Sequence, residues 1–158
     1  MYRYGDLHMK YSWVFLVAAI GSGSGAEAAE VGPCNNLDRA SLVVGQTRSF
    51  SDGKIRIAHV DTDGEPVCCS SHLLVFIPSP EIGSQCFAIS QKAEKGDSSA
   101  RGFSSLDLAR AIASYDPQRG LLLTVPYTLY DLNDKRRRPG AVRVRVDLRD
   151  IGSVAIER

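Results

Sequence analysis

The chain has almost no net charge. Its 158 residues include 19 lysines and arginines against 18 aspartates and glutamates, which gives a formal net charge of +1. A dedicated nucleic-acid or polyanion-binding domain usually has a strong basic excess. The balance therefore argues against such a domain, and no nucleic-acid partner is expected.

Motifs for catalysis are also missing. Residues 29–158 contain no G-x-S-x-G sequence, no phosphate-cradling glycine loop and no paired catalytic carboxylates, and their only histidines are His59 and His72. His72 follows Ser70 and Ser71, but such close neighbours on a strand rarely face each other. The sequence therefore favours a non-catalytic protein and indicates no cofactor.

No apolar run is long enough to cross a bilayer, which needs about 20 residues. The longest, Tyr11–Ile20, has a lysine before it and a Gly/Ser stretch after it, and Ala26–Ala28 has the small-residue pattern of a cleavage site. These features are typical of a secretory signal peptide. We expect cleavage after Ala28, which would leave no membrane span, whether translation begins at Met1 or at Met9.

Export would place the protein in the periplasm or outside the cell. No lipobox precedes Cys34, so a lipid anchor is not expected. Residues 29–158 are the length of one domain and can bury a single core. Within them, residues 91–102 are polar and rich in small side chains, which predicts a flexible loop.

Alternation of apolar and polar residues is the main structural pattern. In Ala141–Arg149 the valines and the leucine fall on one face and the charged residues on the other, as in an antiparallel sheet with one buried face. Leu121–Tyr130 alternates similarly, although Pro126 indicates an edge or a bulge there, and an edge could accept a strand from a partner. Further strands are predicted at residues 54–60, 72–77, 85–90 and 154–157.

Residues 104–116 fit both a strand and a helix. Their alternation and the short turn before Leu121 favour a strand. The sum is an all-β fold, an antiparallel β-sandwich or partly open barrel of about seven or eight short strands with at most one short helix.

All four cysteines lie after the signal peptide, and an even count in an exported chain predicts disulfides. Cys68 and Cys69 are adjacent, and neighbours on a strand point to opposite faces. We therefore expect each to pair separately with Cys34 or Cys86. A vicinal disulfide that acts as a redox switch is an alternative.

A metal-binding or hydrolytic site is the competing interpretation of this region. Its ligands or catalytic groups would come from Cys68 and Cys69 with His59, Asp61, Asp63 and His72. The spacing matches no zinc motif, and the acidic turn at residues 61–65 lacks the later ligands of a calcium loop.

One dense cluster of positive charge precedes the Ala141–Arg149 strand. It predicts a hairpin tip that is either solvated or a surface for polyanions. Nearby acids favour the solvated tip. The candidate polyanion-binding residues are Lys135, Arg136, Arg137, Arg138, Arg143 and Arg145.

Taken together, these features favour a small exported bacterial β-domain, held by two disulfides, that binds a partner without catalysis. The partner would be a protein or the anionic surface of the cell envelope.

Overall fold

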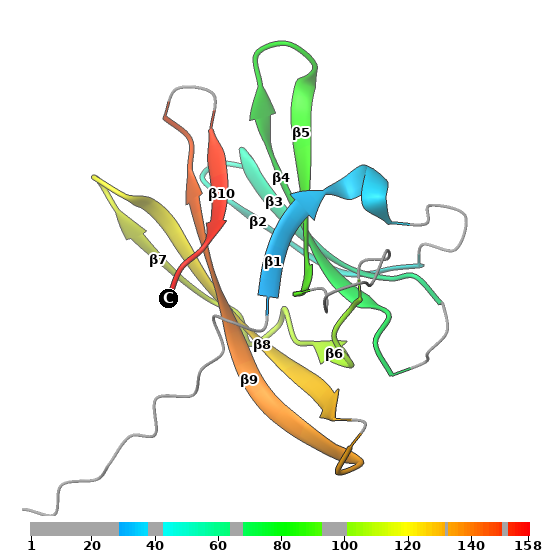
Figure 1. Cartoon of the computed structure of the whole chain (residues 1–158). Coiled ribbons are helices and arrows are strands. Elements are labelled where there is room, and N and C mark those ends of the chain that lie inside the picture. The colour runs from blue at the N-terminus through cyan, green and yellow to red at the C-terminus, as the bar shows by residue number, and fades with distance from the viewer. Residues whose placement is uncertain (1–28, 38–42, 64–67, 93–100, 132, 150–151) are drawn as a thin grey trace, which may run out of the picture.

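The computed structural model describes residues 29–37, 43–63, 68–92, 101–131, 133–149 and 152–158. These residues form two antiparallel five-stranded sheets that pack as a sandwich (Figure 1). The all-β prediction is confirmed, and the open edges make a sandwich rather than a closed barrel. The proposed signal peptide, residues 1–28, lies outside the described residues, as do residues 93–100 of the predicted flexible loop.

The first sheet has the strand order β1-β5-β4-β3-β2. It contains the strands predicted at residues 72–77 and 85–90, which pair with each other as a hairpin. Two of its strands were not predicted, the first and the second along the chain. The bounds are Ala29–Pro33 for β1, Val43–Phe50 for β2, Ile55–Asp61 for β3, Ser71–Ser79 for β4 and Gly83–Gln91 for β5.

The second sheet has the order β10-β9-β8-β6, and β7 also pairs with β8. Its long β8–β9 hairpin projects beyond the body of the sandwich, at the bottom of Figure 1. The bounds are Ser105–Leu106 for β6, Ile112–Asp116 for β7, Gly120–Asp131 for β8, Arg136–Asp147 for β9 and Ser153–Ile156 for β10.

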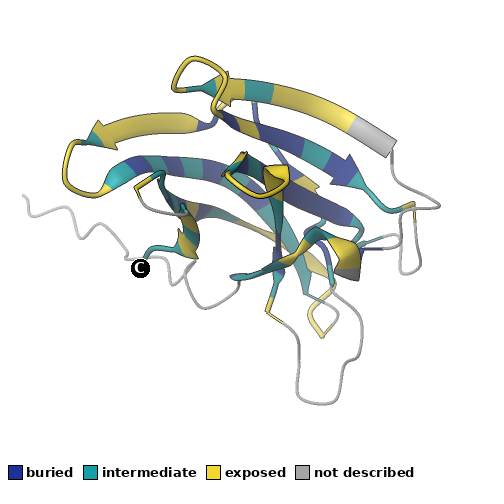
Figure 2. Cartoon of the chain, turned by 90° about the horizontal axis from the view of Figure 1, so that it is seen from above, coloured by how far each residue is buried: buried dark blue, intermediate teal, exposed yellow. Residues whose placement is uncertain are grey.

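The alternating pattern places the core between the sheets. Figure 2 shows buried and more exposed residues in turn along the central strands. Phe103 is fully buried and its ring lies 4.8 Å from that of Tyr127. The Tyr127 ring also covers Gly140, where a Cβ atom would lie 2.6 Å from it, so this position of β9 accepts only glycine without a shift of the ring. From the first sheet, Ile55, Ile57, Leu73, Val75, Ile77 and Ile89 complete the centre of the core.

A smaller apolar cluster lies on the outer face of the first sheet. Its buried members are Leu37, Ala58, Val60, Leu74 and Ala88. The short 3-10 helix η2, Cys34–Asn36, leads into Leu37, and Cys34 and Cys86 pack against the cluster. The first sheet is therefore apolar on part of both faces, which explains the continuous apolar run in β4.

Residues 104–116 form strands and a turn rather than a helix. β6 and β7 both pair with β8, and the segment between them turns so that the Ala111 N–H donates to Leu108 O at 3.2 Å. No helix long and apolar enough to cross a membrane occurs in the described part of the chain.

The sequence predicts an edge strand or a bulge at Pro126, and the edge alternative is wrong. β8 lies between β9 and the pair β6 and β7. On the side of β8 away from β9, the pairing is interrupted opposite Pro126. There β6 pairs with Tyr127 and Thr128, and β7 pairs no further than Thr124. The missing proline N–H falls in that interruption, so a central strand tolerates it.

Candidate functional site

The cysteines pair differently from the sequence-based expectation. Cys34 is linked to Cys86, and Cys68 is linked to Cys69, so none of the four is free. The expectation assumed that Cys68 and Cys69 lie on a strand. They lie instead in the turn before β4, where the opposite-face rule for strand neighbours does not apply.

The Cys68–Cys69 turn is held by the segment that enters β6. The Gly102 N–H donates to Cys69 O at 2.6 Å, and the Ser104 hydroxyl donates to Cys68 O at 2.7 Å. A Cβ atom on Gly102 would lie 2.7 Å from this turn's backbone, so the contact requires glycine. The Arg101 guanidinium lies 3.5 Å from the Cys69 sulfur. These hydrogen bonds hold the turn against the segment that enters β6.

His59 contacts a serine from this region, but the pair lacks the features of a catalytic dyad. Its Nε2 lies 3.1 Å from the Ser71 hydroxyl, which belongs to a residue only 4% exposed. Burial lowers the pKa of His59, and Asp61 partly offsets the effect. The Asp61 carboxylate accepts a hydrogen bond from Ser70 instead of orienting the imidazole, and that bond lowers its pKa. Substrate would not reach the buried hydroxyl.

His72 is directed away from His59. On the neighbouring strand β3, Val60 lies opposite His72, and His59 is the residue before Val60. Adjacent strand residues point to opposite faces, so the two imidazoles lie on opposite faces of the sheet. The His72 Nδ1 lies 2.8 Å from the Ser90 hydroxyl, and burial lowers its pKa to about 4. The imidazole is therefore a neutral, hydrogen-bonded part of the interior at physiological pH.

The alternative metal ligands do not converge. His59 and His72 are separated by the sheet, and Asp63 lies in an exposed turn where its N–H donates to the Asp61 carboxylate at 2.8 Å. Within the ranges that the structure describes, no three His, Cys, Asp or Glu side chains gather as a metal site would require.

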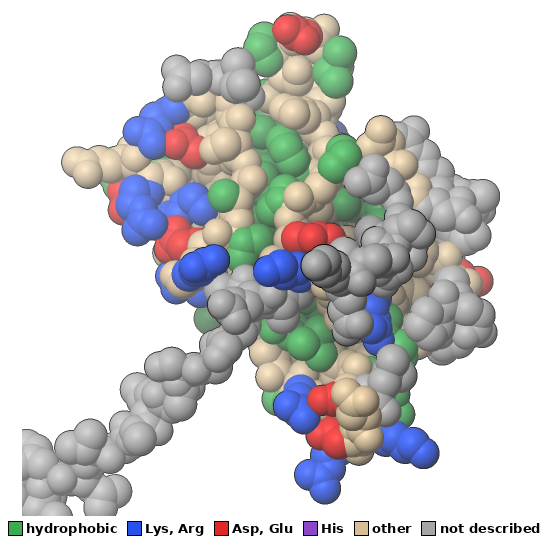
Figure 3. Space-filling view, viewed as in Figure 1, with side chains coloured by type: hydrophobic (Ala, Val, Ile, Leu, Met, Phe, Trp, Pro, Cys, Tyr) green, Lys and Arg blue, Asp and Glu red, His purple; other side chains and the backbone are tan. Residues whose placement is uncertain are grey.

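The predicted polyanion-binding residues are divided into two groups by their ion pairs. Arg138 pairs with Asp131 and Asp134 at 2.9 and 2.6 Å. Arg143 and Arg145 share Glu157, at 3.1 and 2.6 Å, and Arg119 joins them at 2.9 Å. Figure 3 shows the resulting mixture of basic and acidic side chains. The three candidates at the end of the β8–β9 hairpin, Lys135, Arg136 and Arg137, form no ion pair with another described residue.

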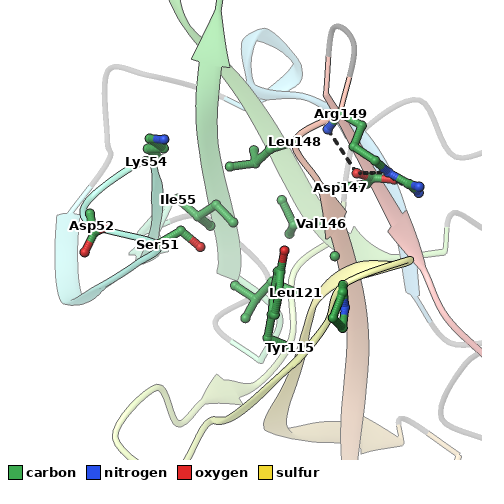
Figure 4. Close-up of a pocket in the computed structure, with 12 residues that line it drawn as sticks. Ser51, Asp52, Lys54, Ile55, Tyr115, Leu121, Val146, Asp147, Leu148 and Arg149 are labelled. Atoms are coloured by element: carbon green, nitrogen blue, oxygen red, sulfur yellow. Dashed lines mark hydrogen bonds and ion pairs between the residues drawn. The ribbon is translucent and has the colours of Figure 1, made fainter.

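A cavity that sequence reasoning missed lies between the two sheets at one end of the sandwich (Figure 4). We call it the end cavity; its volume is about 340 Å³. The β2–β3 turn lies on one side, and β7 with the β7–β8 turn lies on the other. Its lining residues are Ser51, Asp52, Lys54, Ile55, Tyr115, Pro117, Gly120, Leu121, Val146, Asp147, Leu148 and Arg149.

The end cavity has an apolar floor and a charged rim. The side chains of Ile55, Leu121, Val146 and Leu148 point toward its centre in Figure 4. At the rim, the Asp147 carboxylate binds the Arg149 guanidinium, and these hydrogen bonds lower the Asp147 pKa. An apolar interior with a polar rim is the usual character of a small-ligand site.

Tyr115 gives the end cavity its only aromatic wall among the described lining residues. Its side chain is 70% exposed, and Ile112 on the same strand is 68% exposed. Large exposed apolar residues on an edge strand often mark a contact surface. The alternation of residues 104–116 predicts this strand. The cavity itself forms only because the β2–β3 and β7–β8 turns pack near each other.

Comparisons with known proteins give no relative. No protein-family model, curated protein or solved structure matches the chain.

Proposed function

We propose that this protein is a non-catalytic binding module that takes a compact apolar group of its ligand into the end cavity. The observation that carries the proposal is the combination of an apolar floor with a charged rim in a cavity of about 340 Å³. Ligand pockets in proteins begin at about this size. The end cavity is therefore suited to one ring or one branched chain rather than to a whole cofactor.

The lining residues support binding in preference to catalysis. The hydroxyl of Ser51 is a possible nucleophile, but the described lining contains no histidine to act as its base. The Asp147 carboxylate is bound by Arg149. A hydrolytic nucleophile needs a base within hydrogen-bond reach. The competing hydrolase or metal site around His59 and His72 is disfavoured by their opposite orientations.

We also propose that the module acts after export, in the periplasm or outside the cell. Support comes from the signal-like sequence before residue 29 and from the pairing of all four cysteines, because disulfides persist in oxidising compartments. N-terminal sequencing of the native protein tests this part. A chain that starts at Glu30 or Ala29 supports export, and an uncut start in a reducing cytosol contradicts it.

The cavity is tested with phenylnaphthylamine, a neutral dye whose fluorescence rises in apolar surroundings. The wild-type protein should enhance its fluorescence in a saturable way. Leu148→Glu should abolish the enhancement, because it puts a carboxylate against the apolar floor.

Leu129→Glu is the matched control. Leu129 is also a half-buried leucine that packs against the core, but it does not line the end cavity. Equal loss of fluorescence in both variants, at equal thermal stability, would contradict the proposal, as would wild-type protein that leaves the dye unchanged.

A further inference from the structure

Two positive side chains of the first sheet stand apart from the other cations. Arg56 on β3 and Lys54 just before it form no ion pair with another described residue. Both side chains are exposed. Their charges are therefore available to a ligand, whereas the guanidinium groups of Arg138, Arg143 and Arg145 already form ion pairs with carboxylates.

The pairing register defines what surrounds Arg56. Ser49 on β2 and Phe76 on β4 lie directly opposite it, and Cys86 on β5 lies opposite Phe76. Residues opposite each other in an antiparallel sheet share a face, so these four side chains form one row on the outer face. The Arg56 guanidinium lies over the Phe76 ring, 5.7 Å from its centroid. This stacking fixes the guanidinium plane without using its N–H donors for an acid.

Arg56 and Phe76 together line two shallow hollows of about 290 and 230 Å³. We call this continuous surface the Arg56 groove. No acidic side chain lines either hollow; the nearest acids in sequence, Asp52 and Glu81, belong to adjoining turns. The polar side chains on this face of the lining are those of Thr47, Ser49, Lys54, Arg56 and Ser84.

Arg48 lies beside the groove on β2, but its side chain is on the inner face of the sheet, because it pairs with Ile57 of the core. Its guanidinium donates hydrogen bonds to the carbonyl oxygens of Leu108 at 3.0 Å and of Ala111 at 2.5 Å. These bonds attach the β2 edge of the first sheet to the turn between β6 and β7. The exposed positive charge of the groove therefore comes from Lys54 and Arg56.

We propose that the Arg56 groove binds a ligand with a single oxyanion group joined to a ring. The planar guanidinium can donate two parallel hydrogen bonds to a phosphate, sulfate or carboxylate, and the hydroxyls of Thr47 and Ser49 supply further donors. The exposed part of Phe76 offers an apolar face to the ring. Charge complementarity selects an anionic ligand in preference to a neutral or basic one. This site is separate from the floor of the end cavity, so it does not depend on the dye-binding proposal.

Phenyl phosphate and phenylacetate are the probes, because they join a ring to the two commonest oxyanions. Each is titrated into the full mature protein while backbone amide NMR signals are followed. At least one should move the signals of Ser49, Arg56 and Phe76 saturably, and added salt should weaken the effect. The stronger probe identifies the preferred oxyanion. Benzyl alcohol, which is neutral, should cause much smaller shifts.

Arg56→Gln should weaken the binding by about tenfold or more, because the charge-assisted hydrogen bonds are lost. Arg56→Lys keeps the charge but loses the planar fork, so binding should be intermediate. Arg137→Gln is the control, since Arg137 is also exposed and without an ion pair among the described residues. Unchanged amide signals away from the groove would show that each variant folds.

The proposal is overturned if neither probe gives saturable shifts at the groove. It is also overturned if benzyl alcohol binds as well as the anions, or if Arg137→Gln weakens binding as much as Arg56→Gln. Loss of dye binding in Leu148→Glu with phenyl phosphate binding retained would show that the two sites are independent.

Discussion

The outer faces of the two sheets use positive charge in opposite ways. On the second sheet, Arg143 and Arg145 converge with Arg119 on the Glu157 carboxylate. On the first sheet, Arg56 stacks on Phe76 and pairs with no acid among the described residues. Arg119, Arg143 and Arg145 are therefore less available than Arg56, whereas Lys135, Arg136 and Arg137 at the hairpin end also lack an ion pair with a described residue. An arginine's availability depends on its neighbours in the folded chain rather than on the number of arginines beside it in sequence.

The two faces also differ in what stabilises them. The first sheet has an apolar cluster and the Cys34–Cys86 disulfide, which joins residues separated by 52 positions. The second sheet has ion pairs that are partly exposed to solvent. Exposed ion pairs contribute little stability, whereas a long covalent loop restricts the unfolded chain strongly. The following changes test this contrast from the largest expected effect to the smallest.

Removal of the long disulfide should have the largest effect. The double variant Cys34→Ala/Cys86→Ala should lower the free energy of unfolding by about 4 kcal/mol, because the unfolded chain regains the freedom of a long loop. Cys68→Ala/Cys69→Ala closes almost no loop and should cost less than half as much. Urea unfolding of both variants measures the difference. Equal losses would mean that the contrast between the two crosslinks is wrong.

Acid should weaken the first sheet next most strongly. The folded-state pKa of His72 is about 4, below the ordinary 6.5, because the imidazole is buried. The unfolded chain therefore takes up the proton first as the pH falls. The free energy of unfolding is therefore unaffected by His72 above pH 6.5. It falls as the pH drops toward 4, by roughly 3 kcal/mol in total.

His72→Gln should reduce that pH dependence. His59 contributes in the same direction because burial lowers its pKa also, and Asp61 opposes the shift in both histidines, so a smaller slope should remain. Urea unfolding across this pH range provides the slopes. As the pH is lowered, the hydrogen-exchange protection of the amides in β3–β5 should fall before that of the amides in β8–β9. The reverse order would contradict the claim that acid weakens the first sheet first.

Much of this architecture follows from the sequence. The alternation in Ala141–Arg149 predicts the buried face of β9, because a period of two leaves one choice of face. The hairpin of β4 and β5 follows from two apolar runs and the turn residues between them. Strands β1 and β2 have no comparable alternation, and their place in the sheet comes from pairing with β5 and β3.

The site residues were harder to predict, because their properties depend on contacts between distant segments. The Cys34–Cys86 pairing requires η2 to lie over the outer face, which no local pattern indicates. Glu157 neutralises the arginines of β9 only because the chain end returns beside that strand. The end cavity likewise depends on two turns that are far apart in sequence.

A smaller effect is expected when the acid of the second sheet is removed. Glu157→Gln should lower the free energy of unfolding by less than the loss of the long disulfide, since Arg119 and Arg143 in two of its three ion pairs are exposed to solvent. It should also free Arg143 and Arg145, so the protein should elute from heparin at higher salt. Asp107→Asn, which removes one exposed pair with Arg110, is the control and should change elution less. Unchanged heparin elution for Glu157→Gln would contradict the idea that Glu157 offsets the charge of Arg143 and Arg145.

The smallest effect should come from the end of the β8–β9 hairpin. Replacement of Arg136 and Arg137 by serine removes two exposed charges and should change stability by no more than about 0.5 kcal/mol. Elution from heparin should move only slightly to lower salt. A complete loss of heparin retention would restore the hairpin tip as the principal polyanion surface.

The most direct test of the difference between the two faces follows the arginine side chains themselves. NMR signals of the Nε–Hε groups are recorded while inorganic phosphate is added at constant ionic strength. The Arg56 signal should shift at low phosphate. The Arg145 signal should stay fixed because its Nε–H donates to Glu157, and the Arg143 signal should shift little because both of its terminal nitrogens already donate, one to Glu157 and one to Arg158 O. A shift of the Arg143 and Arg145 signals before that of Arg56 would contradict the account.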